Sequence, residues 1–472
     1  MYAHRIVLGT ALGLAVGMPV GPAQAAPYSS HSQIYSCCTV AATKESMFRA
    51  AKESGAAYIR VDINMPAIFA PERYGFRLGP LDLPFPLKPP SRGPDWTGVD
   101  DIARLSRQYG LPVLGILLGS SNPAASCPER IDRQRLCPPA DPTQWGAQAG
   151  EVAARYRGVI DNFEIWNEPD GRWAFAGGPE DYGQLLASSY DAIKAAAPSA
   201  RVVLGGTMYP NARGADWLSR VFRTPGTDSA RKFDVSSIHV RGRTKVMLTD
   251  MRERVRFLKR AGRSTPMWVT EHGYPGSTKW QRDSDYRGGE RAQAAYLAES
   301  LPALALAGAD QVFVTLRDGG GGQFDSEGIL RGQGRPGEAF SRKAAWQTVR
   351  DAALNWPVSA FRQHHVQSNA RAHPGRSRAR GGHATVHVEV AGRFRGPGCG
   401  GSLRLGFRLA DGRRTVRTAT LGPGCRYRKA QVLMLARRAR GRVTLRIDQR
   451  FLGNARTGPG DAKTLRVHVK LR

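Results

Sequence analysis

Short apolar runs and longer amphipathic segments alternate along most of the chain. The apolar runs have the length and residue types of strands buried on both faces, and we expect such strands at 34–37, 57–63, 111–118, 159–166, 201–204, 233–240, 267–271 and 311–316. Between them, apolar residues recur at helical spacing, at 44–53, 99–108, 143–157, 181–197, 215–222, 248–261, 292–301 and 342–353. Eight strand–helix repeats predict an α/β fold, a (β/α)8 TIM barrel, whose functional residues lie at the carboxyl ends of the strands.

Two of the expected strands end in a glutamate. The run FEIWNEPD (163–170) stops at Pro169, which cannot continue a strand ladder, and MWVTEHG (267–273) carries Glu271 at its end. By the strand count, Glu168 follows the fourth strand and Glu271 the seventh, so the two face one another across the barrel mouth. A single glutamate at a strand end is often only a helix cap. Two of them, each beside Asn or His and an aromatic residue, indicate a catalytic pair.

The pattern changes after about residue 357. Residues 362–382 are rich in Arg, His, Gly and Ser and are typical of a linker, and four later runs alternate apolar and polar residues with period two, at 386–390, 403–405, 443–447 and 465–469. With Gly and Pro between them, these runs predict a small antiparallel β-sandwich. The predicted domains are a signal peptide (1–25), a barrel (26–357), a basic linker (358–382) and an accessory sandwich (383–472).

The charge is unevenly distributed between these domains. The 472-residue chain has a formal net charge of +30, and residues 361–472 contain 26 basic and 4 acidic side chains. The basicity therefore belongs to the C-terminal part. It indicates binding to an anionic polymer such as acidic wall polysaccharide, with a merely solvated arginine-rich surface as the alternative. A nucleic-acid partner is not expected, because the sandwich has no recognisable single-strand-binding motif with interleaved aromatic residues.

The first residues have the pattern of a secretory signal. His4 and Arg5 precede an apolar run (6–20), and Ala-Gln-Ala (23–25) is a small-residue cleavage site. A membrane anchor is the rival interpretation, but the run is shorter than the roughly 20 residues needed to span a bilayer and is broken by Gly and Pro. We expect an exported protein, extracellular or attached to the cell wall, without stable membrane insertion.

An even number of cysteines in an exported chain suggests disulfides. The six are Cys37, Cys38, Cys127, Cys137, Cys399 and Cys425. Fifteen pairings are possible, and local spacing favours 127 with 137 and 399 with 425. The adjacent pair at 37 and 38 is then either a vicinal disulfide or two buried thiols. No CxxC pair or His-rich cluster accompanies them, so neither a metal nor a cofactor is expected.

The paired glutamates suit the hydrolysis of a glycosidic bond. That reaction needs one carboxylic acid to protonate the leaving oxygen and one carboxylate to attack or to activate water. With Asn-Glu-Pro after strand four and Thr-Glu-x-Gly after strand seven, residues 30–355 resemble the clan A (β/α)8 retaining glycoside hydrolases, and most closely the β-xylosidase-like family 39. The resemblance implies that Glu168 is the acid/base, that Glu271 is the nucleophile, and that Asn167 bonds a sugar hydroxyl.

The same resemblance assigns roles to further residues. Arg60 matches a strand-two arginine that keeps the nucleophile ionised, and His239 matches a strand-six histidine. From the residues alone, a structural ion pair remains open for Arg60 and a core position for His239. Trp173, Phe175 and Trp280 are candidates for sugar-stacking surfaces, with ordinary loop packing as the alternative.

The sequence departs from the clan pattern in two places. His239-Val240-Arg241 lacks the tyrosine of the usual His-x-Tyr arrangement, and strand eight lacks the aromatic residue that commonly forms the floor of the innermost sugar site. Our hypothesis is a secreted, metal-independent, retaining glycoside hydrolase that acts on an oligo- or polysaccharide. The alternative is a barrel that has lost turnover and binds carbohydrate or cell wall.

Overall fold

The computed structural model covers most of the chain. It describes residues 27–71, 75–76, 85–86, 93–128, 132–208, 212–280, 289–319, 325–332, 340–376, 384–435 and 441–471. The expected signal peptide (1–25) and the side chain of Trp280 lie outside the described part. No helix within the described residues is both long and apolar enough to cross a bilayer.

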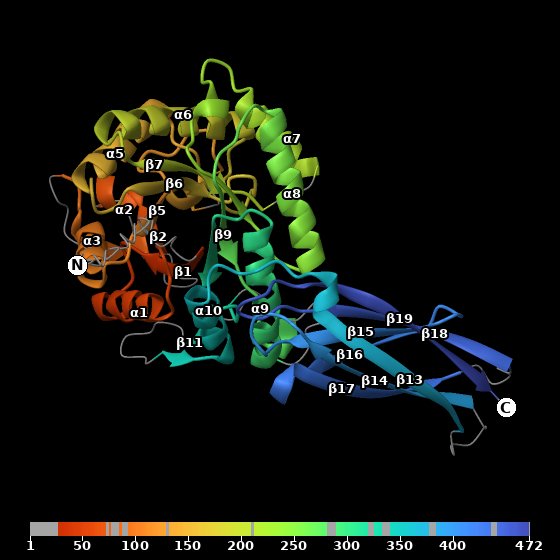
Figure 1. The fold of residues 1–472 in the computed structure, drawn as a ribbon. Helices are drawn as coiled ribbons and strands as arrows, with labels where there is room; N and C mark the ends of the chain where they lie inside the picture. The colour runs from red at the N-terminus through yellow and green to blue at the C-terminus, as the bar shows by residue number, and fades with distance from the viewer. Residues whose placement is uncertain are drawn as a thin grey trace, which may run out of the picture.

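Eight parallel strands form a closed barrel (Figure 1). They are β1 (Tyr28–Tyr35), β2 (Ile59–Asn64), β5 (Val113–Leu118), β6 (Asn162–Asn167), β7 (Arg201–Gly206), β8 (Ser236–His239), β9 (Met267–His272) and β10 (Gln311–Thr315). Their order is β7-β6-β5-β2-β1-β10-β9-β8. Parallel bridges Val203–Val235 and Thr207–Ile238 connect the two end strands, β7 and β8, and so close the barrel. The predicted (β/α)8 barrel is confirmed, and the strands follow in the predicted order. The first strand was expected at 34–37 but runs from Tyr28 to Tyr35.

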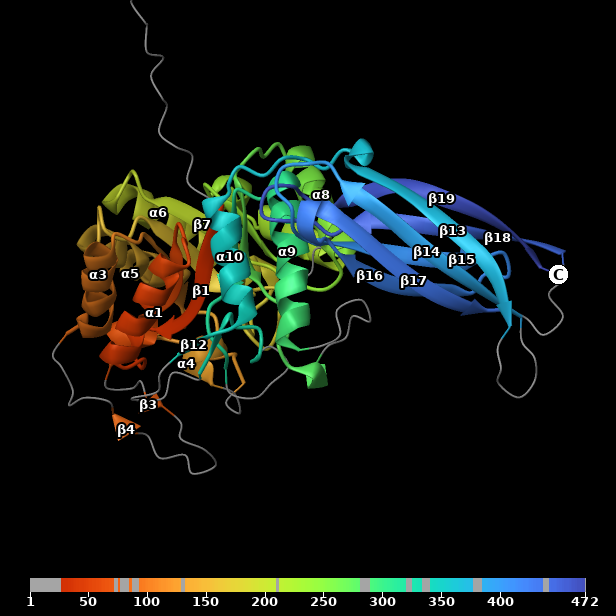
Figure 2. The same cartoon turned by 60° about the horizontal axis from the view of Figure 1, so that its bottom comes forward.

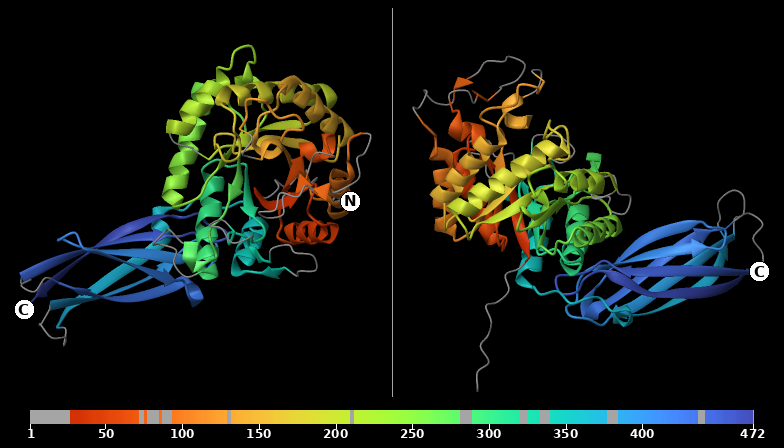
Figure 3. Two further views of the ribbon diagram at one scale, coloured as in Figure 1. Left: turned by 180° about the vertical axis from the view of Figure 1, so that it is seen from behind. Right: turned by 90° about the horizontal axis from the view of Figure 1, so that it is seen from above.

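Helices surround the barrel, as Figures 1 and 3 show. They are α1 (Ala41–Glu53), α2 (Met65–Phe69), α3 (Thr97–Tyr109), α4 (Arg133–Leu136), α5 (Pro142–Arg155), α6 (Pro179–Ala196), α7 (Ala212–Phe222), α8 (Thr244–Arg260), α9 (Glu290–Leu306) and α10 (Ala344–Leu354). Two short hairpins are added, β3 (Gly75–Phe76) with β4 (Phe85–Pro86) and β11 (Leu330–Arg331) with β12 (Ser341–Arg342). Local sequence defines the helix ends; Asp141, for example, accepts two backbone N–H bonds at the start of α5 and is followed by Pro142.

Seven antiparallel strands follow the barrel and form two facing sheets (Figure 2). They are β13 (Val366–Arg376), β14 (Ala384–Phe394), β15 (Ser402–Leu409), β16 (Arg414–Thr420), β17 (Arg426–Met434), β18 (Gly441–Phe451) and β19 (Gly460–Leu471). One sheet has the order β13-β14-β17 and the other β16-β15-β18-β19. Their inner faces share one apolar core, so the predicted sandwich is confirmed.

One expectation within this region is wrong. The range 358–382 was predicted as a basic linker, but β13 occupies its centre and pairs with β14 from Val366 to Arg376. Ala370 and Ala372 on alternate positions pack against the sandwich core. Small side chains, separated by Arg, His and Asn, give little hydrophobic contrast between the two faces of a strand. Pairing with a strongly alternating neighbour therefore decides the structure here.

A buried glutamate joins the barrel to the sandwich. Glu299 of α9 is 1% exposed, and its two oxygens lie 3.6 Å from Arg404 and 3.5 Å from Arg450. Burial raises the pKa of Glu299, and the two guanidiniums act in the opposite direction. Ser359 also bonds to the backbone of Arg456. The sandwich is thus attached through polar contacts at one end, and its other end projects away from the barrel (Figures 1 and 3).

Three disulfides are present. Cys127–Cys137 and Cys399–Cys425 are bonded as the spacing predicted. Cys37–Cys38 forms a vicinal disulfide, which decides between the two alternatives that the sequence left open.

Candidate active site

A buried arginine connects three strands at the barrel mouth. Side chains alternate along β2, and Arg60 points inward and is completely buried. It donates to Glu164 (2.7 Å) and to Asn167 (2.8 Å) on β6, and to Glu271 (3.0 Å) on β9. The ion pair with Glu164 is structural and the one with Glu271 reaches a predicted catalytic group. For Arg60 the sequence left open a structural ion pair or a contact with the predicted nucleophile, and its side chain makes both contacts.

A second guanidinium holds Glu271 from the opposite side. Arg241, two residues after His239, donates to Glu271 Oε2 at 2.9 Å. Its Nε donates to the carboxylate of Glu327 at 3.0 and 3.2 Å, and Glu327 is buried. Arg241 thus occupies the position where the resemblance expects a tyrosine. Sequence reasoning missed its contact with Glu271, although an arginine two residues past a strand-end histidine was the available signal.

The surroundings of Glu271 favour its ionised form. Burial alone would raise the pKa of this carboxyl group, but neighbouring positive groups hold the pKa well below its usual range. The groups are the imidazoles of His239 and His31, when protonated, and the guanidiniums of Arg241 and Arg60. Burial lowers the pKa of His31 to about 3, so that ring is neutral at neutral pH. The two arginines therefore supply the permanent charge.

His239 connects the two predicted catalytic glutamates. Its Nδ1 lies 2.9 Å from Glu168 Oε1 and 3.6 Å from Glu271 Oε2. Its Nε2 is buried and has no hydrogen-bond partner among the described residues. A proton on Nδ1 is then the better arrangement, because it is donated to Glu168 and no buried N–H is left unsatisfied. A Cβ on Gly206 would lie 2.2 Å from Nε2, so only glycine leaves room for this ring.

The backbone that presents Glu168 is strained. Trp166 and Glu168 have φ values of 64° and 49°, in the left-handed region that non-glycine residues rarely adopt. Trp166 is fixed by a bond from its indole N–H to Ala174 (2.8 Å), and the Glu168 N–H donates to Gly206 (3.1 Å). Each such residue costs about 1–3 kcal/mol, and such strain is concentrated at functional sites. Packing around Trp166 therefore turns the Glu168 side chain toward β8 and β9.

The aromatic candidates have different positions. Trp173 is 55% exposed and its indole N–H donates to Glu168 Oε2 at 3.2 Å, so its ring lies beside the predicted catalytic pair. Phe175 is completely buried between Trp166 and Tyr182. Of the two interpretations left open for Phe175, packing is therefore the correct one, because aromatic contacts around Trp166 draw this ring into the core.

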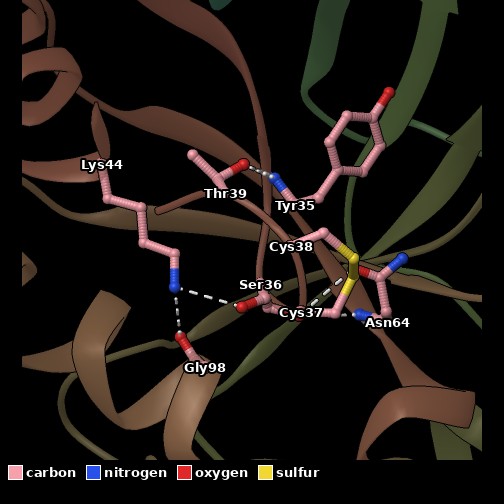
Figure 4. The surroundings of a disulfide bond; sticks show 8 residues. All are labelled: Tyr35, Ser36, Cys37, Cys38, Thr39, Lys44, Asn64 and Gly98. Carbon is pink, nitrogen blue, oxygen red and sulfur yellow. Dashed lines mark hydrogen bonds between the residues drawn. A yellow bond between two sulfur atoms is a disulfide. The ribbon is translucent and has the colours of Figure 1, made fainter. Parts of the chain in front are cut away.

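The vicinal disulfide lies at the carboxyl end of β1, beside the end of β2 (Figure 4). The Cys37 sulfur is 3.2 Å from the side-chain oxygen of Asn64, and Lys44 donates to the Ser36 carbonyl (3.1 Å) beneath it. A pocket of about 470 Å³ opens here. Two residues before Asn64, the buried Asp62 has a pKa raised to about 7 by burial.

The predicted catalytic pair does not have the character of a cation site. One ligand atom each from Glu168, His239 and Glu271 lies within 4.8 Å of the others, a spacing that suits a metal ion. Both oxygens of Glu271, however, already accept bonds from Arg60 and Arg241. Two positive charges at this distance, on the fully buried Arg60 and the partly buried Arg241, repel a divalent cation.

A scan against protein-family models and a search of curated proteins gave no match for this sequence. Solved structures do match. A glucosidase from Croceicoccus marinus aligns with 14% identity over 89% of this chain and 95% of its own, with a TM-score of 0.51. A monomeric β-xylosidase from Caulobacter crescentus CB15 aligns with 14% identity over 87% and 95%, with a TM-score of 0.50. A GH39 enzyme from Xanthomonas axonopodis pv. citri aligns with 14% identity over 86% and 91%, with a TM-score of 0.49.

The chain is similar in structure to the clan A (β/α)8 glycoside hydrolases. This confirms the resemblance stated from the sequence, at the level of the fold. Because identity is so low, the chemistry has to be argued from the side chains of this chain.

Proposed function

We propose that the protein is a retaining glycoside hydrolase in which Glu271 is the nucleophile and Glu168 the acid/base. The observation that carries the proposal is the position of both carboxylates around His239 Nδ1, which lies 3.6 Å from Glu271 and 2.9 Å from Glu168. An oxygen of each lies within 4.8 Å of the other. Retaining enzymes have carboxyl groups about 5–5.5 Å apart, whereas inverting enzymes need about 6.5–9.5 Å to admit water.

The two carboxyl groups divide the reaction between them. A Glu271 oxygen attacks the anomeric carbon as the bond to the leaving oxygen breaks, and Glu168 gives its proton to that oxygen. A glycosyl ester on Glu271 results. Water then attacks the same carbon, Glu168 takes the proton from water, and Glu271 leaves as a carboxylate. When Glu271 is esterified, Arg60 keeps Glu164 and Arg241 keeps Glu327, so each guanidinium retains a counterion.

Further residues support substrate binding in this proposal. Asn167, held by Arg60, is available to bond the sugar hydroxyl beside the reacting carbon, and the exposed Trp173 ring offers a stacking surface. The substrate class is an oligo- or polysaccharide. The signal-like residues 1–25 and three disulfides support export to an oxidising compartment, and the basic sandwich supports retention near anionic wall polymers.

One observation favours a second candidate, a barrel that binds carbohydrate without turnover. Two guanidiniums donate to Glu271, and such strong stabilisation of a carboxylate weakens it as a nucleophile. A barrel that binds sugar but no longer turns it over would explain why Arg241 stands where the clan pattern has a tyrosine.

Activated aryl glycosides test the proposal. We expect wild type to release the aryl group, and Glu271→Gln to release none. Glu168→Ala should form the glycosyl ester from good leaving groups and stall until azide is added, giving a glycosyl azide of retained configuration. The matched control Glu180→Ala changes an exposed carboxylate and should behave as wild type. Inverted product from wild type would refute the mechanism, and absence of turnover across aryl glycosides with measurable sugar binding would favour the second candidate.

A further inference from the structure

Four arginines lie side by side on the outer face of the four-stranded sheet. Arg408 on β15 is opposite Arg414 on β16 and Arg446 on β18, and Arg446 is opposite Arg466 on β19. Residues directly opposite in an antiparallel sheet point to the same face. These four, here called the arginine row, are all exposed. Neighbouring strands are about 4.8 Å apart, so the row extends over about 14 Å.

The row is not balanced by its own sheet. Like charges directly opposite one another destabilise a sheet. Among the described residues, Asp448 is the acidic side chain that forms ion pairs with the row, at 3.5 Å from Arg408 and 2.9 Å from Arg446. Further along the same face Arg442 lies opposite Lys470, which adds positive charge. One carboxylate therefore faces six basic side chains.

The same sheet face shows how such arginines can be neutralised. Nearer the barrel, Arg404 and Arg450 are also directly opposite one another, and the carboxylate of Glu299 lies between them at 3.6 and 3.5 Å. The arginine row repeats this pairing four residues further along β15, where no carboxylate from the described part of the barrel forms an ion pair with it. An external carboxylate on the row would lie between directly opposite guanidiniums, as Glu299 does, but at an exposed surface.

We infer that the arginine row binds a linear acidic polysaccharide, whose carboxylates occupy the position that Glu299 has at the barrel end. A planar guanidinium donates two parallel bonds to a carboxylate, and a polymer presents carboxylates in series along the row. The choice of a polysaccharide rests on the proposed function of the barrel. Single-stranded nucleic acid is less well suited, because none of the large exposed apolar side chains of the described sandwich, Val432 and Met434, is aromatic.

The test compares two triple variants of the full-length protein. R408Q/R446Q/R466Q removes three charges from the row, and the matched control R371Q/R393Q/R428Q removes three exposed arginines from the other sheet. The probes are polygalacturonate and neutral galactan. Wild type should bind polygalacturonate at low salt, bind galactan weakly, and release the acidic polymer steeply as salt rises. The row variant should lose about tenfold or more in affinity, with the control within about threefold.

Two outcomes would overturn the inference. Equal losses in the two variants would mean that total charge, not the row, binds the polymer. Equally tight binding of single-stranded DNA by wild type, lost in the row variant, would assign the row to nucleic acid. Melting curves check that both variants are folded. Binding is measured without turnover and also in Glu271→Gln, so failure here leaves the hydrolase proposal intact, and an inactive barrel leaves this binding result intact.

Discussion

Replacing Arg241 by glutamine tests how Glu271 is kept ionised. In R241Q, Glu271 loses a donor at 2.9 Å and Glu327 loses its partner at 3.0 Å. Both carboxylates are buried. A buried charge left without its partner destabilises a protein by about 3–5 kcal/mol, so we expect the free energy of unfolding to fall by about that amount.

The double variant R241Q/E327Q separates ionisation from stability. It removes both charges of the pair, which is often nearly neutral for stability. Two charges about 4 Å apart interact with about 4 kcal/mol at an effective dielectric constant near 20, or about three pKa units at 1.36 kcal/mol each. Loss of the negative Glu327 cancels part of this. The pKa of Glu271, held low in wild type, should therefore rise by about 1–2 units in the double variant.

The pH dependence of kcat/KM with an active aryl glycoside measures this change. Glu271 attacks only when ionised, so the acid limb of the profile follows its pKa, and that limb should move to higher pH by about 1–2 units. The control is R220Q/E180Q, an exposed pair at 2.8 Å, which should shift neither the profile nor, by more than about 1 kcal/mol, the stability. An unmoved acid limb in R241Q/E327Q, or an R241Q protein as stable as the control, would refute the reasoning.

Three further predictions concern stability. Burial raises the pKa of Asp62 to about 7, above its unfolded value near 3.9; the folded state then binds the extra proton, and stability should fall as pH rises from about 4 to 7, by at most about 4 kcal/mol. Asp62→Asn should remove this part of the pH dependence in melts at pH 5 and pH 8, and an unchanged slope would contradict it. Glu299→Ala should loosen the sandwich and speed tryptic cleavage near residues 358–362, whereas Glu389→Ala, which removes an exposed carboxylate, should not. Cys127→Ala/Cys137→Ala opens a loop with a separation of 10 residues and should lower the free energy of unfolding by about 3 kcal/mol; equal denaturation midpoints would exclude that contribution.

Periodicity was sufficient to predict the barrel, because buried strands and amphipathic helices differ clearly in their hydrophobic patterns. Strand counting also brought Glu168 and Glu271 together, since position along a barrel strand fixes position in space. It could not identify the partners of Arg241. Glu327 lies 86 residues from Arg241 in sequence, outside the strands that were counted, and a charged residue in a loop gives no sign that it will be buried.

Phe175 and strand β13 are two further places where the sequence was not sufficient to predict the structure. Phe175 follows an exposed Trp173 within one loop, and only the three-dimensional packing of Trp166 separates a core ring from a surface ring. Strand β13 lacked a hydrophobic pattern of its own, and its structure depends on β14, a partner that follows it in the chain. Both outcomes depend on tertiary neighbours, which local propensity does not include.

The ion pairs of the mouth divide between the two halves of the chain. Arg60 and Glu164 both precede residue 208, and Arg241 and Glu327 both follow residue 212. During synthesis from the N-terminus, the first half-barrel can therefore neutralise its buried cation before the second half exists, and the second half carries its own balanced pair. Glu271 lies in the second half with Arg241, and its bond from Arg60 forms only when the halves meet. We expect fragments divided after Met208 to reassemble when coexpressed, with Glu271 as a polar link across the new junction.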